Sequence, residues 1–338
     1  MIKWAVIGTG QISRSIVPDM IQVGLDVHVV QSRDEAKAAA FAREFSIPRW
    51  ESNFRAVLDD PAVKAVYIAT PIATHARMAT QAILAGKHVL VEKPLATTAA
   101  EVDELFVLAR NTGVFLMEAM WMKFNPAYRR LHAELKADAL GGPPTFLRAG
   151  FAIPFPEESN PSRWDVTLSG GALLDQAIYP VTLAHSLFGP PTRITAGGRV
   201  REDGLDLSEH VTLEYDDGRF AQFFTAMDEF GDCSASVGGP KGWLTLPPPF
   251  WATTDLEIHT GSFRTIFHSP DLRKNDREGN GFVPMLRAVA EALDNNLVEQ
   301  PLHGAADTSA VFATLEAIRR QLGRRGAEKT ATTSSHPR

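Results

Sequence analysis

The order of apolar and polar positions changes once along the chain. Up to about residue 119, short apolar runs alternate with helix-length stretches in which Ala and charged residues recur. This alternation predicts a parallel sheet covered by helices, because each pair of parallel strands needs a crossover between them. The predicted strands are Lys3–Gly8, Asp26–Ser32, Ala65–Thr70, His88–Glu92 and Val114–Glu118.

Local signals mark the ends of the helices in this half. Helices are predicted over Glu35–Phe45 and His75–Leu84, and Gly86 follows the second of them as a helix terminator. Thr97-Thr98 followed by Glu101 has the pattern of a capping box. It predicts the start of a helix that runs to about residue 112.

Beyond residue 122 strand-like runs outnumber helices. The turn Asp216-Asp217-Gly218 separates two of these runs and is typical of a β-hairpin. The pattern predicts a large, mostly antiparallel open sheet in a separate α+β domain. The runs are Arg193–Arg201, His210–Tyr215, Phe220–Thr225, Ser234–Val237, Trp243–Leu246, Asp255–Thr260 and Phe263–His268, with helices over Pro126–Ala137, Gly171–Phe188, Pro284–Asn295 and Ala305–Leu322.

Length and composition agree with two domains. The chain has 338 residues, of which 44% are hydrophobic, and a typical domain holds about 100–200 residues. We expect domains at 1–122 and 123–324. The last segment, 325–338, contains Thr-Ala-Thr-Thr-Ser-Ser and little to bury, so a disordered tail is predicted there.

Charge and cysteine content narrow the class of protein. With 34 basic and 40 acidic side chains the formal net charge is −6, so no basic excess points to nucleic acid or to anionic lipid. The one cysteine, Cys233, cannot form an internal disulfide. No signal-peptide pattern opens the chain, and no apolar run approaches the roughly 20 residues that cross a bilayer. We therefore expect a soluble, cytoplasmic protein with a small-molecule substrate.

A glycine turn follows the first predicted strand. The residues Gly8-Thr9-Gly10-Gln11-Ile12 lie where a dinucleotide-binding turn is found, with Ser13 at the position of the third glycine. The first glycine permits a tight turn, and the second lets the backbone approach a pyrophosphate at the helix N-terminus. An ordinary glycine turn is the alternative.

The end of the second predicted strand bears on the choice of cofactor. An NAD site usually has an acidic residue there, whereas this chain has Ser32-Arg33. A hydroxyl next to a guanidinium suits a 2′-phosphate, so NADP is favoured over NAD. Alternatively, Arg33 is an exposed residue at the start of a helix, and Asp34 binds the ribose.

Two further groups could carry chemistry. Lys93, in Glu92-Lys93-Pro94, lies at the carboxyl edge of the parallel sheet, where such sheets bind ligands. Asp175 and Tyr179 lie four residues apart on one predicted helix. A tyrosine with a pKa lowered by an ammonium group can exchange a proton with a substrate hydroxyl. From the residues alone, a core tyrosine and an exposed aspartate are the preferred explanation of this pair.

Several motifs together resemble the Gfo/Idh/MocA oxidoreductase family. The chain is most similar to its branch of dimeric dihydrodiol dehydrogenases and NADP-dependent D-xylose dehydrogenases, and the likeness covers about residues 2 to 323. The motifs are Gly8-x-Gly10, Thr70-Pro71 with His75, Glu92-Lys93-Pro94, Met117-Glu118-Ala119-Met120-Trp121, Gly170-Gly171-Ala172-Leu173-Leu174-Asp175 with Tyr179, and Gly239-Pro240-Lys241-Gly242.

The resemblance implies an N-terminal Rossmann domain, with a doubly wound parallel sheet, and a C-terminal domain for substrate binding and dimerisation. It implies that Lys93, Tyr179 and Asp175 are catalytic, and that a homodimer or higher homo-oligomer forms through the open sheet. The implied cofactor-binding residues are Gly8, Thr9, Gly10, Gln11, Ile12, Ser32, Arg33, Thr70, Pro71, His75, Glu92, Lys93, Arg163 and Trp164, and the implied substrate-binding residues are Trp121, Phe151, Phe155, Asp175 and Tyr179.

The implied reaction is hydride transfer between a carbinol carbon and the nicotinamide of NADP. The expected substrate is a sugar or cyclic polyol, with trans-dihydrodiol oxidation or dicarbonyl-sugar reduction as alternatives. A cofactor-binding sensor without turnover is an alternative of another class. No metal is expected, because His75, His185, His210 and Asp175 do not form a recognisable metal-ligand spacing.

Overall fold

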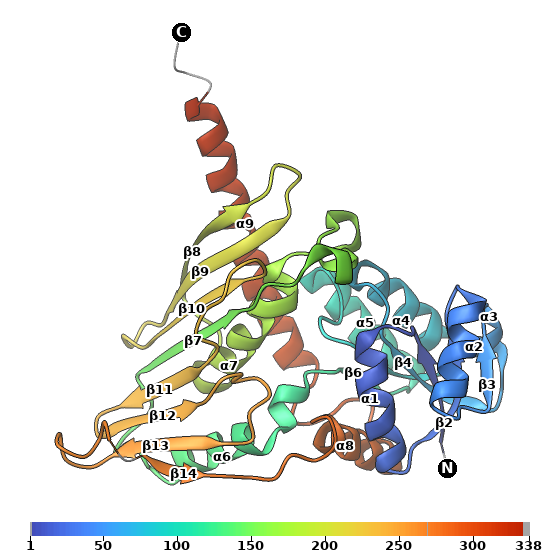
Figure 1. Ribbon diagram of the computed structural model, residues 1–338, viewed down its shortest axis with the longest axis horizontal. Helices are drawn as coiled ribbons and strands as arrows, with labels where there is room; N and C mark the ends of the chain where they lie inside the picture. Colours follow the sequence, from blue (N-terminus) through green and yellow to red (C-terminus); the bar gives the residue numbers. More distant parts are fainter. Residues whose placement is uncertain (1, 269, 334–338) are drawn as a thin grey trace. The chain divides into compact units, whose positions relative to one another are not determined.

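The computed structural model describes residues 2–268 and 270–333. The chain divides into two compact units. The first comprises Met1–Asn125 with Asp276–Ser309, and the second Pro126–Asn275 with Ala310–Arg338. Each unit has a sheet of its own (Figure 1). In the described part of the chain, no helix combines the length and the apolar character needed to span a membrane.

The first unit contains a six-stranded parallel sheet in the order β3-β2-β1-β4-β5-β6. Its strands carry continuous apolar runs that are buried, as expected for a sheet covered on both faces. The five predicted strands are confirmed, but the short polar β3 carries no apolar run and was not predicted. The strands are β1 (Lys3–Ile7), β2 (Asp26–Gln31), β3 (Arg49–Glu51), β4 (Val63–Ile68), β5 (His88–Val91) and β6 (Leu116–Glu118).

Helices connect these strands, and their caps follow the sequence signals. Thr98 caps α5 and forms the predicted capping box with Glu101, and Gly113 ends the helix in the left-handed region at φ 68°. The helices are α1 (Gln11–Gln22), α2 (Glu35–Glu44), α3 (Phe54–Asp59), α4 (His75–Leu84) and α5 (Ala99–Thr112), with short helical turns η1 (Ile72–Thr74) and η2 (Trp121–Phe124).

The segment Asp276–Ser309 belongs to the first unit, whereas the predicted domain ranges place it in the second. It contains α8 (Val283–Asp294). The backbone N–H groups of Asn280 and Phe282 donate to the carboxylate of Asp19, and the N–H of Leu116 donates to the carbonyl of Val298. These contacts join residues far apart in the chain, which a sequence pattern does not reveal.

The second unit contains an eight-stranded sheet in the order β14-β13-β12-β11-β7-β10-β9-β8. Only the pair β7 and β10 is parallel among its described strands, so the mostly antiparallel prediction is confirmed. The strands are β7 (Phe146–Ala152), β8 (Arg193–Val200), β9 (Asp206–Glu214), β10 (Phe220–Ala226), β11 (Ala235–Gly239), β12 (Gly242–Leu246), β13 (Leu256–Thr260) and β14 (Asp271–Arg273).

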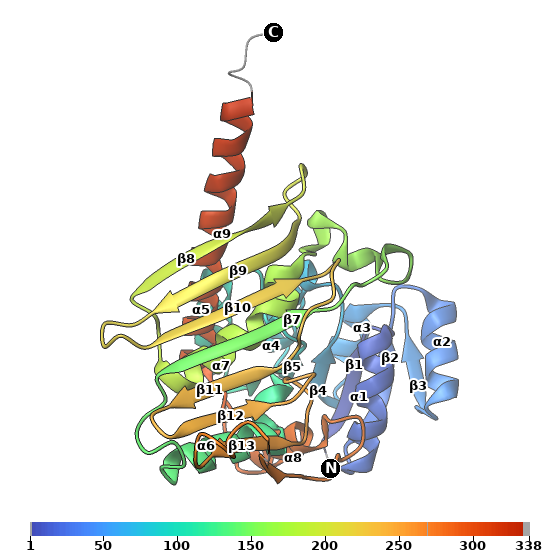
Figure 2. The same ribbon diagram turned by 60° about the vertical axis from the view of Figure 1, so that its left-hand side comes forward.

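One face of this sheet is covered by helices of its own unit. In Figure 2 the strands lie side by side with α7 (Ile178–Phe188) behind them, and no helix of the described chain crosses the front. The unit also contains α6 (Pro126–Lys136) and, from residue 310 on, α9 (Ala305–Thr333). Gln321 on α9 bonds the backbone of β8 through both its amide N and O. The uncovered front agrees with the predicted open sheet.

Two predictions at the end of the chain differ from the structure. The run Phe263–His268 forms turns instead of a strand, because the N–H groups of Thr265 and Ile266 both donate to the carbonyl of Ser262. The edge strand β14 follows instead. Helix α9 continues to Thr333, into the segment for which a disordered tail is predicted, and residues 334–338 of that segment lie outside the described residues.

Candidate functional site

The glycine turn of the first unit has the geometry of a phosphate cradle. Gly8 has φ 108°, and a side chain there would collide with the carbonyl of Ala69. Gly10 is the N-cap of α1, no side chain caps the helix, and a Cβ on Gly10 would meet nothing within 4 Å. Uncapped N–H groups facing open space fit a dinucleotide pyrophosphate, with Thr9, Gln11 and Ile12 in the same turn.

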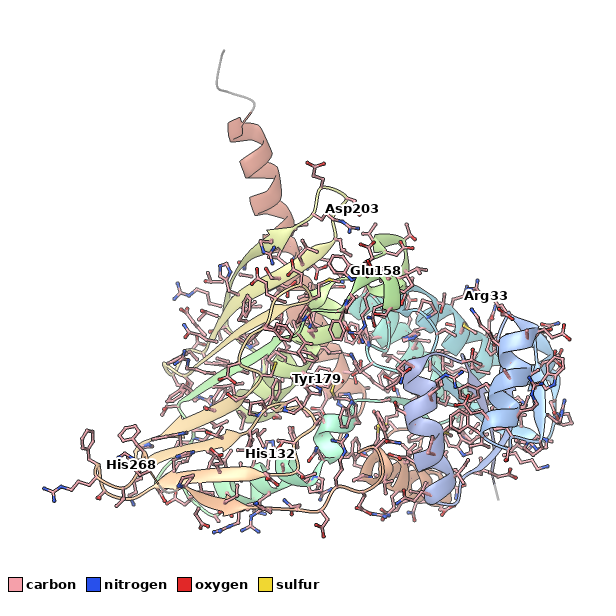
Figure 3. All side chains as sticks on the ribbon, in the orientation of Figure 1. Arg33, His132, Glu158, Tyr179, Asp203 and His268 are labelled. Atoms are coloured by element: carbon pink, nitrogen blue, oxygen red, sulfur yellow. The ribbon has the colours of Figure 1, made fainter. Side chains whose placement is uncertain are left out.

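A cavity of about 620 Å³ opens beside this sheet edge. It brings together four predicted residues, namely Ser32, Arg33, Thr70 and Pro71. Arg33 is labelled in Figure 3. The alternative ligand, Asp34, caps α2 by accepting the N–H of Lys37 (3.0 Å), so its carboxylate is engaged locally. The other lining residues are Gln31, Ser52, Asn53, Phe54, Arg55, Thr74, Arg77, Met78 and Gln81.

Two arginines of this cavity were not predicted as site residues. Arg55 pairs with Asp59 one turn along α3 (2.9 Å), which offsets much of its charge. Arg77 lies on α4, two residues after His75, and is exposed. Its position on a neighbouring helix gives no signal in a glycine-motif search. The cavity therefore presents Arg77 as well as Arg33 to an anionic group.

His75 joins two turns of the first unit. Its ring is 1% exposed, with Nδ1 2.8 Å from the carbonyl O of Pro94 and Nε2 2.7 Å from that of Thr70. Burial lowers the pKa of this imidazole. The neutral ring has one N–H, which donates to one of these two carbonyls, and the other carbonyl lies beside the second ring nitrogen. His75 therefore joins the Thr70-Pro71 turn to the turn that carries Lys93, and its predicted cofactor contact stays a prediction.

Glu92 is buried beneath the same turn. Its carboxylate accepts the hydroxyl of Tyr67 (2.6 Å) and the backbone N–H of Lys93 (3.2 Å). Burial, opposed in part by the Tyr67 hydrogen bond, raises the pKa of Glu92 to about 7. The carboxylate therefore anchors Lys93, and 6% exposure leaves it little surface for the cofactor contact that the resemblance implies.

The raised pKa of Glu92 predicts a pH-dependent stability. In the folded state the Glu92 carboxyl keeps its proton up to about pH 7. Its contribution to the free energy of unfolding is therefore complete below the pKa of the unfolded chain and is lost as the pH rises through 7. Between pH 4.5 and 8.5 the free energy of unfolding of the wild type is expected to fall by on the order of 3 kcal/mol, and Glu92→Gln is expected to abolish this fall. Denaturant unfolding at several pH values measures both proteins. Glu104→Gln, at an exposed position of α5, is the control, and parallel curves for wild type and Glu92→Gln would contradict the assignment.

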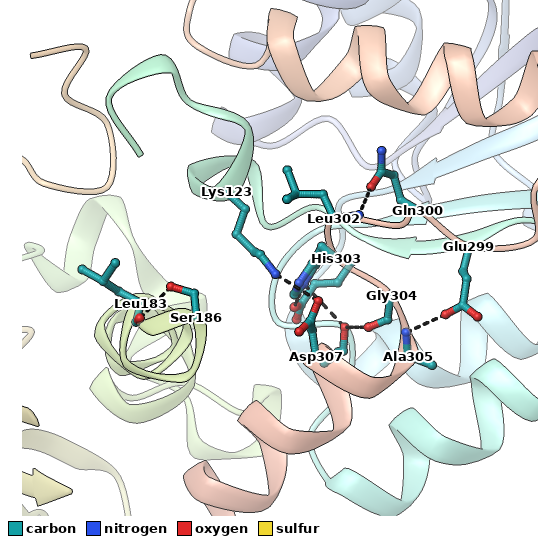
Figure 4. A network of polar contacts seen from close by, with 12 residues as sticks. Lys123, Leu183, Ser186, Glu299, Gln300, Leu302, His303, Gly304, Ala305 and Asp307 are labelled. Atoms are coloured by element: carbon teal, nitrogen blue, oxygen red, sulfur yellow. Dashed lines mark hydrogen bonds and ion pairs between the residues drawn. The ribbon is translucent and has the colours of Figure 1, made fainter. Parts of the chain in front are cut away.

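A buried Glu118–His303 pair supports the Lys93 turn from below. Oε1 of Glu118 accepts the N–H of Leu95 (2.8 Å), and Oε2 lies 2.8 Å from Nε2 of His303. Neither side chain is exposed. Figure 4 shows His303 at the start of α9, near the ion pair between Lys123 and Asp307 (3.0 Å). These contacts tie the returning segment to the turn that holds Lys93.

The second unit carries Asp175 on a widened helical turn. Leu173–Ala177 forms a π-helix, η6, directly before α7, and such turns are frequent at functional sites. The guanidinium of Arg163 binds Asp175 (Nη1 to Oδ2, 2.5 Å) and lies 3.9 Å above the ring of Phe155. The prediction of one regular helix over Gly171–Phe188 was wrong at this turn.

The Gly170-Gly171 motif has a steric cause. A Cβ on Gly170 would collide with the carbonyl of Arg163, whereas Gly171, at φ 116°, would collide with the carboxylate of Asp206. The N–H of Gly171 also donates to the carbonyl of Arg163 (3.0 Å). Arg163 therefore holds the turn through its backbone and Asp175 through its side chain.

Tyr179 lies in an aromatic cluster of the second unit. Its ring centroid is 5.6 Å from that of Phe151 and 6.0 Å from that of Trp251, and the last two rings stack at 3.5 Å. All three are less than a tenth exposed. The position of Tyr179 is labelled in Figure 3. Trp251 follows a proline-rich loop and was not predicted as a site residue, because its partners lie on β7 and α7.

Models of one family match both halves of the chain. The oxidoreductase family with an NAD-binding Rossmann fold matches residues 2–120, and the GFO/IDH/MocA C-terminal domain matches residues 128–245. The chain belongs to the Gfo/Idh/MocA family. The predicted resemblance and the predicted fold class are thereby confirmed.

Relatives within the Gfo/Idh/MocA family span the whole chain. The trans-1,2-dihydrobenzene-1,2-diol dehydrogenase of Mus musculus is 32% identical over 329 residues, which are 95% of this chain and 97% of the relative. That of Xenopus tropicalis is 31% identical over 95% of this chain and 98% of its own.

Solved structures share the Gfo/Idh/MocA fold. A 3-ketoreductase from Actinomadura kijaniata, in complex with NADP, superposes with a TM-score of 0.85 at 27% identity, covering 95% of this chain and 98% of its own. An aldose-aldose oxidoreductase from Caulobacter crescentus superposes at 0.84 with 24% identity, covering 96% and 98%, and shows the fold alone.

The remaining predicted residues of this family member take packing positions. Trp121 is 8% exposed and packs on Phe282, with ring centroids 4.9 Å apart. The indole N–H of Trp164 donates to the carbonyl of Phe155 (2.8 Å). Lys93 and Trp121 belong to the first unit, whereas Arg163, Asp175 and Tyr179 belong to the second.

Metal ligands are not gathered at any of these places. Within residues 2–268 and 270–333, no three His, Cys, Asp or Glu side chains are grouped so that they could hold a metal ion. Two of the histidines considered as metal ligands, His185 and His210, lie in other surroundings. Nε2 of His185 lies 2.8 Å from the hydroxyl of Thr314, and His210 is exposed on β9.

Proposed function

We propose that this protein is an NADP-dependent oxidoreductase that oxidises a secondary hydroxyl on a ring-shaped diol or polyol, or reduces the corresponding carbonyl. The proposal rests on the surroundings of Tyr179 in the second unit. Tyr179 follows the turn in which Arg163 binds Asp175, and the aromatic rings of Phe151 and Trp251 lie beside it. Membership of an oxidoreductase family supplies the reaction class.

The proposed chemistry needs a base for one proton. When bound, NADP⁺ accepts a hydride at C4 of its nicotinamide. As the C–H bond breaks, the substrate O–H proton moves to the phenolate oxygen of Tyr179, and the C=O bond forms. Lys93 of the first unit is proposed as the catalytic cation, and Tyr179 afterwards releases the proton to solvent. Asp175, fixed by Arg163, orients the substrate hydroxyls.

NADP is proposed over NAD because of the charge around the cavity at β2. Arg33 and Arg77 both line it, and Ser32 offers a hydroxyl beside them. A 2′-phosphate carries about two negative charges and three acceptor oxygens, which guanidinium groups bind well. The related 3-ketoreductase was crystallised with NADP, and levoglucosan dehydrogenase, a more distant neighbour at 19% identity, with NADH.

The substrate class follows from the wall and from the relatives. Phe151 and Trp251 present aromatic faces next to Tyr179, and such faces pack against the apolar face of a pyranose or of a dihydrodiol ring. Two relatives that are 31–32% identical over 95% of the chain are named for trans-1,2-dihydrobenzene-1,2-diol. Cyclic vicinal diols include both that compound and the sugars and polyols expected from the sequence.

A substrate panel tests this proposal. Fluorescence titration with NADPH and NADH comes first, followed by absorbance at the nicotinamide band with D-xylose, D-glucose, myo-inositol and trans-1,2-dihydrobenzene-1,2-diol. Turnover of one ring diol with NADP⁺ is the expected result. Binding without turnover of any would instead support the cofactor-binding sensor, and no binding of either cofactor would contradict the proposal at its first step.

A second candidate is reduction in the opposite direction. The structure at 27% identity is that of a 3-ketoreductase crystallised with a TDP-linked compound, and Tyr179 could equally donate a proton to a nascent alkoxide. Running the panel with NADPH and a keto-sugar distinguishes the two directions by their relative kcat/KM.

We further propose a homodimer formed through the open face of the eight-stranded sheet. Phe146, Phe224 and Trp243 lie on this face among polar residues and line a hollow of about 780 Å³. Apolar rings on an uncovered sheet face favour a second copy of the chain. We expect Phe224→Arg to shift the protein from dimer to monomer in sedimentation velocity, with Thr195→Ser on the same face as control. A wild-type monomer at low micromolar concentration would contradict the dimer.

A further inference from the structure

A β-bulge in the second unit brings two acidic residues to one side of β9. In the pairing of β8 with β9, Arg199 faces Ser208 but Val200 faces Asp206, so Leu207 is the extra residue. Asp206 and Glu209 are three apart and would otherwise point to opposite faces. The bulge turns Asp206 to the side of Glu209, as bulges near active sites commonly do.

The carboxyl groups of Asp206 and Glu209 lie next to each other. Each is the other's hydrogen-bond neighbour, and Glu209 is completely buried. The hydroxyl of Thr225 donates to Oε2 of Glu209, and Oε1 has no hydrogen-bond partner among the described residues. Arg319 on α9 is the cation whose charge acts on Asp206. Burial, together with the charge of Asp206, holds the pKa of Glu209 well above its usual range, as expected for two adjacent carboxyls.

Asp206 also holds the start of the helix that carries Asp175. The N–H of Leu173 donates to Oδ2 of Asp206 (2.5 Å), and Gly171 lies against the same carboxylate. The π-turn Leu173–Ala177 packs on β9 and β10, where the side-chain amide of Gln176 donates to the carbonyl of Ala226 (3.0 Å). Asp206 thus binds the first residue of the π-turn, and α7 follows directly after its last residue.

We propose that Asp206 and Glu209 form a single-proton pair that positions the turn carrying Asp175 and the helix carrying Tyr179. Asp206 is the acceptor that fixes the turn, and Glu209 keeps that acceptor oriented. Neither residue touches substrate or cofactor in this role, so both are positioning residues. The inference rests on the proposed roles of Asp175 and Tyr179, but the pair itself is testable without substrate.

The first test measures the protonation of the carboxyl pair in the protein without ligand. Infrared difference spectra of wild type minus Asp206→Asn and of wild type minus Glu209→Gln at pH 7 are expected to show the C=O stretch of one protonated carboxyl that both variants lack. The band of protonated Glu92 is present in all three proteins and cancels in the difference. Either amide can donate to the remaining carboxylate, which then ionises. Glu214→Gln, which replaces a half-buried acid on the same strand that pairs with Arg193, should leave the band unchanged. A wild type without this band contradicts the shared proton, whether or not any substrate is turned over.

The second test measures how firmly Asp206 holds residues 171–177. Losing a charged acceptor for a buried N–H should speed amide hydrogen exchange over residues 171–177 by about 10- to 100-fold in Asp206→Ala, whereas Asp206→Asn restores wild-type exchange. On D-xylose or trans-1,2-dihydrobenzene-1,2-diol, kcat is expected to fall by a similar factor in Asp206→Ala with the Kd of NADPH unchanged. Unchanged exchange in Asp206→Ala overturns the proposal. Absent turnover in wild type contradicts the proposed function and leaves the exchange result decisive.

Discussion

Replacing Tyr179 with Phe is expected to lower kcat by about 10²- to 10⁴-fold, the usual contribution of a positioned acid–base group. The phenyl ring keeps the packing against Phe151 and Trp251, so the loss is confined to the hydroxyl. The cofactor turn and cavity lie in the first unit, and the Kd of NADPH should therefore stay unchanged. Single-turnover absorbance with the substrate found by the panel measures the effect.

Tyr215→Phe is the matched control for this substitution. Tyr215 is also a buried tyrosine of the second unit, 7% exposed, and its hydroxyl finds no hydrogen-bond partner in the described chain. Its removal should change neither kcat nor thermal stability. A Tyr179→Phe variant with wild-type kcat would remove Tyr179 from the mechanism, and equal loss in both variants would point to a general packing effect.

The supports of Lys93 and of Asp175 are built on the same physical principle. Beneath Lys93, the buried carboxylates of Glu92 and Glu118 accept the N–H groups of Lys93 and Leu95. Beneath Asp175, the carboxylate of Asp206 accepts the N–H of Leu173. Buried acids bonded to backbone donors fix a loop more rigidly than exposed ones, because each unmade bond would leave an unsatisfied group. Both turns are therefore held before a ligand binds.

The sequence predicted the elements whose signals are local. The capping box at Thr98, the helix stop at Gly86 and the glycine turn at Gly8 depend on residues within a few positions of one another, and the structure has them where expected. Ser32 and Thr70, both predicted to bind the cofactor, line one cavity, since both follow parallel strands whose carboxyl ends meet at one edge.

The features that were missed depend on long-range contacts. The π-turn Leu173–Ala177 adds a residue to a helix without changing its apolar pattern, and its anchor, Asp206, is distant in sequence. The contact between Asp19 and Phe282 joins opposite ends of the chain. The ring of His75 lies between carbonyls of two turns that are distant from each other in the chain. No window of neighbouring residues holds this information.

Replacing Arg33 with Ala is expected to weaken NADPH binding by about 10- to 100-fold, because a charge-assisted hydrogen bond to a phosphate contributes roughly 1.5–3 kcal/mol. NADH lacks the 2′-phosphate, so its Kd should change by less than about threefold. Arg77→Ala should have the same selective effect, since Arg77 lines the same cavity, and the double variant should bind both cofactors alike. Arg110→Ala, at an exposed position in the last turn of α5, is the control. Fluorescence titration measures all four variants, and equal losses for NADPH and NADH in Arg33→Ala would show that the guanidinium does not bind the 2′-phosphate.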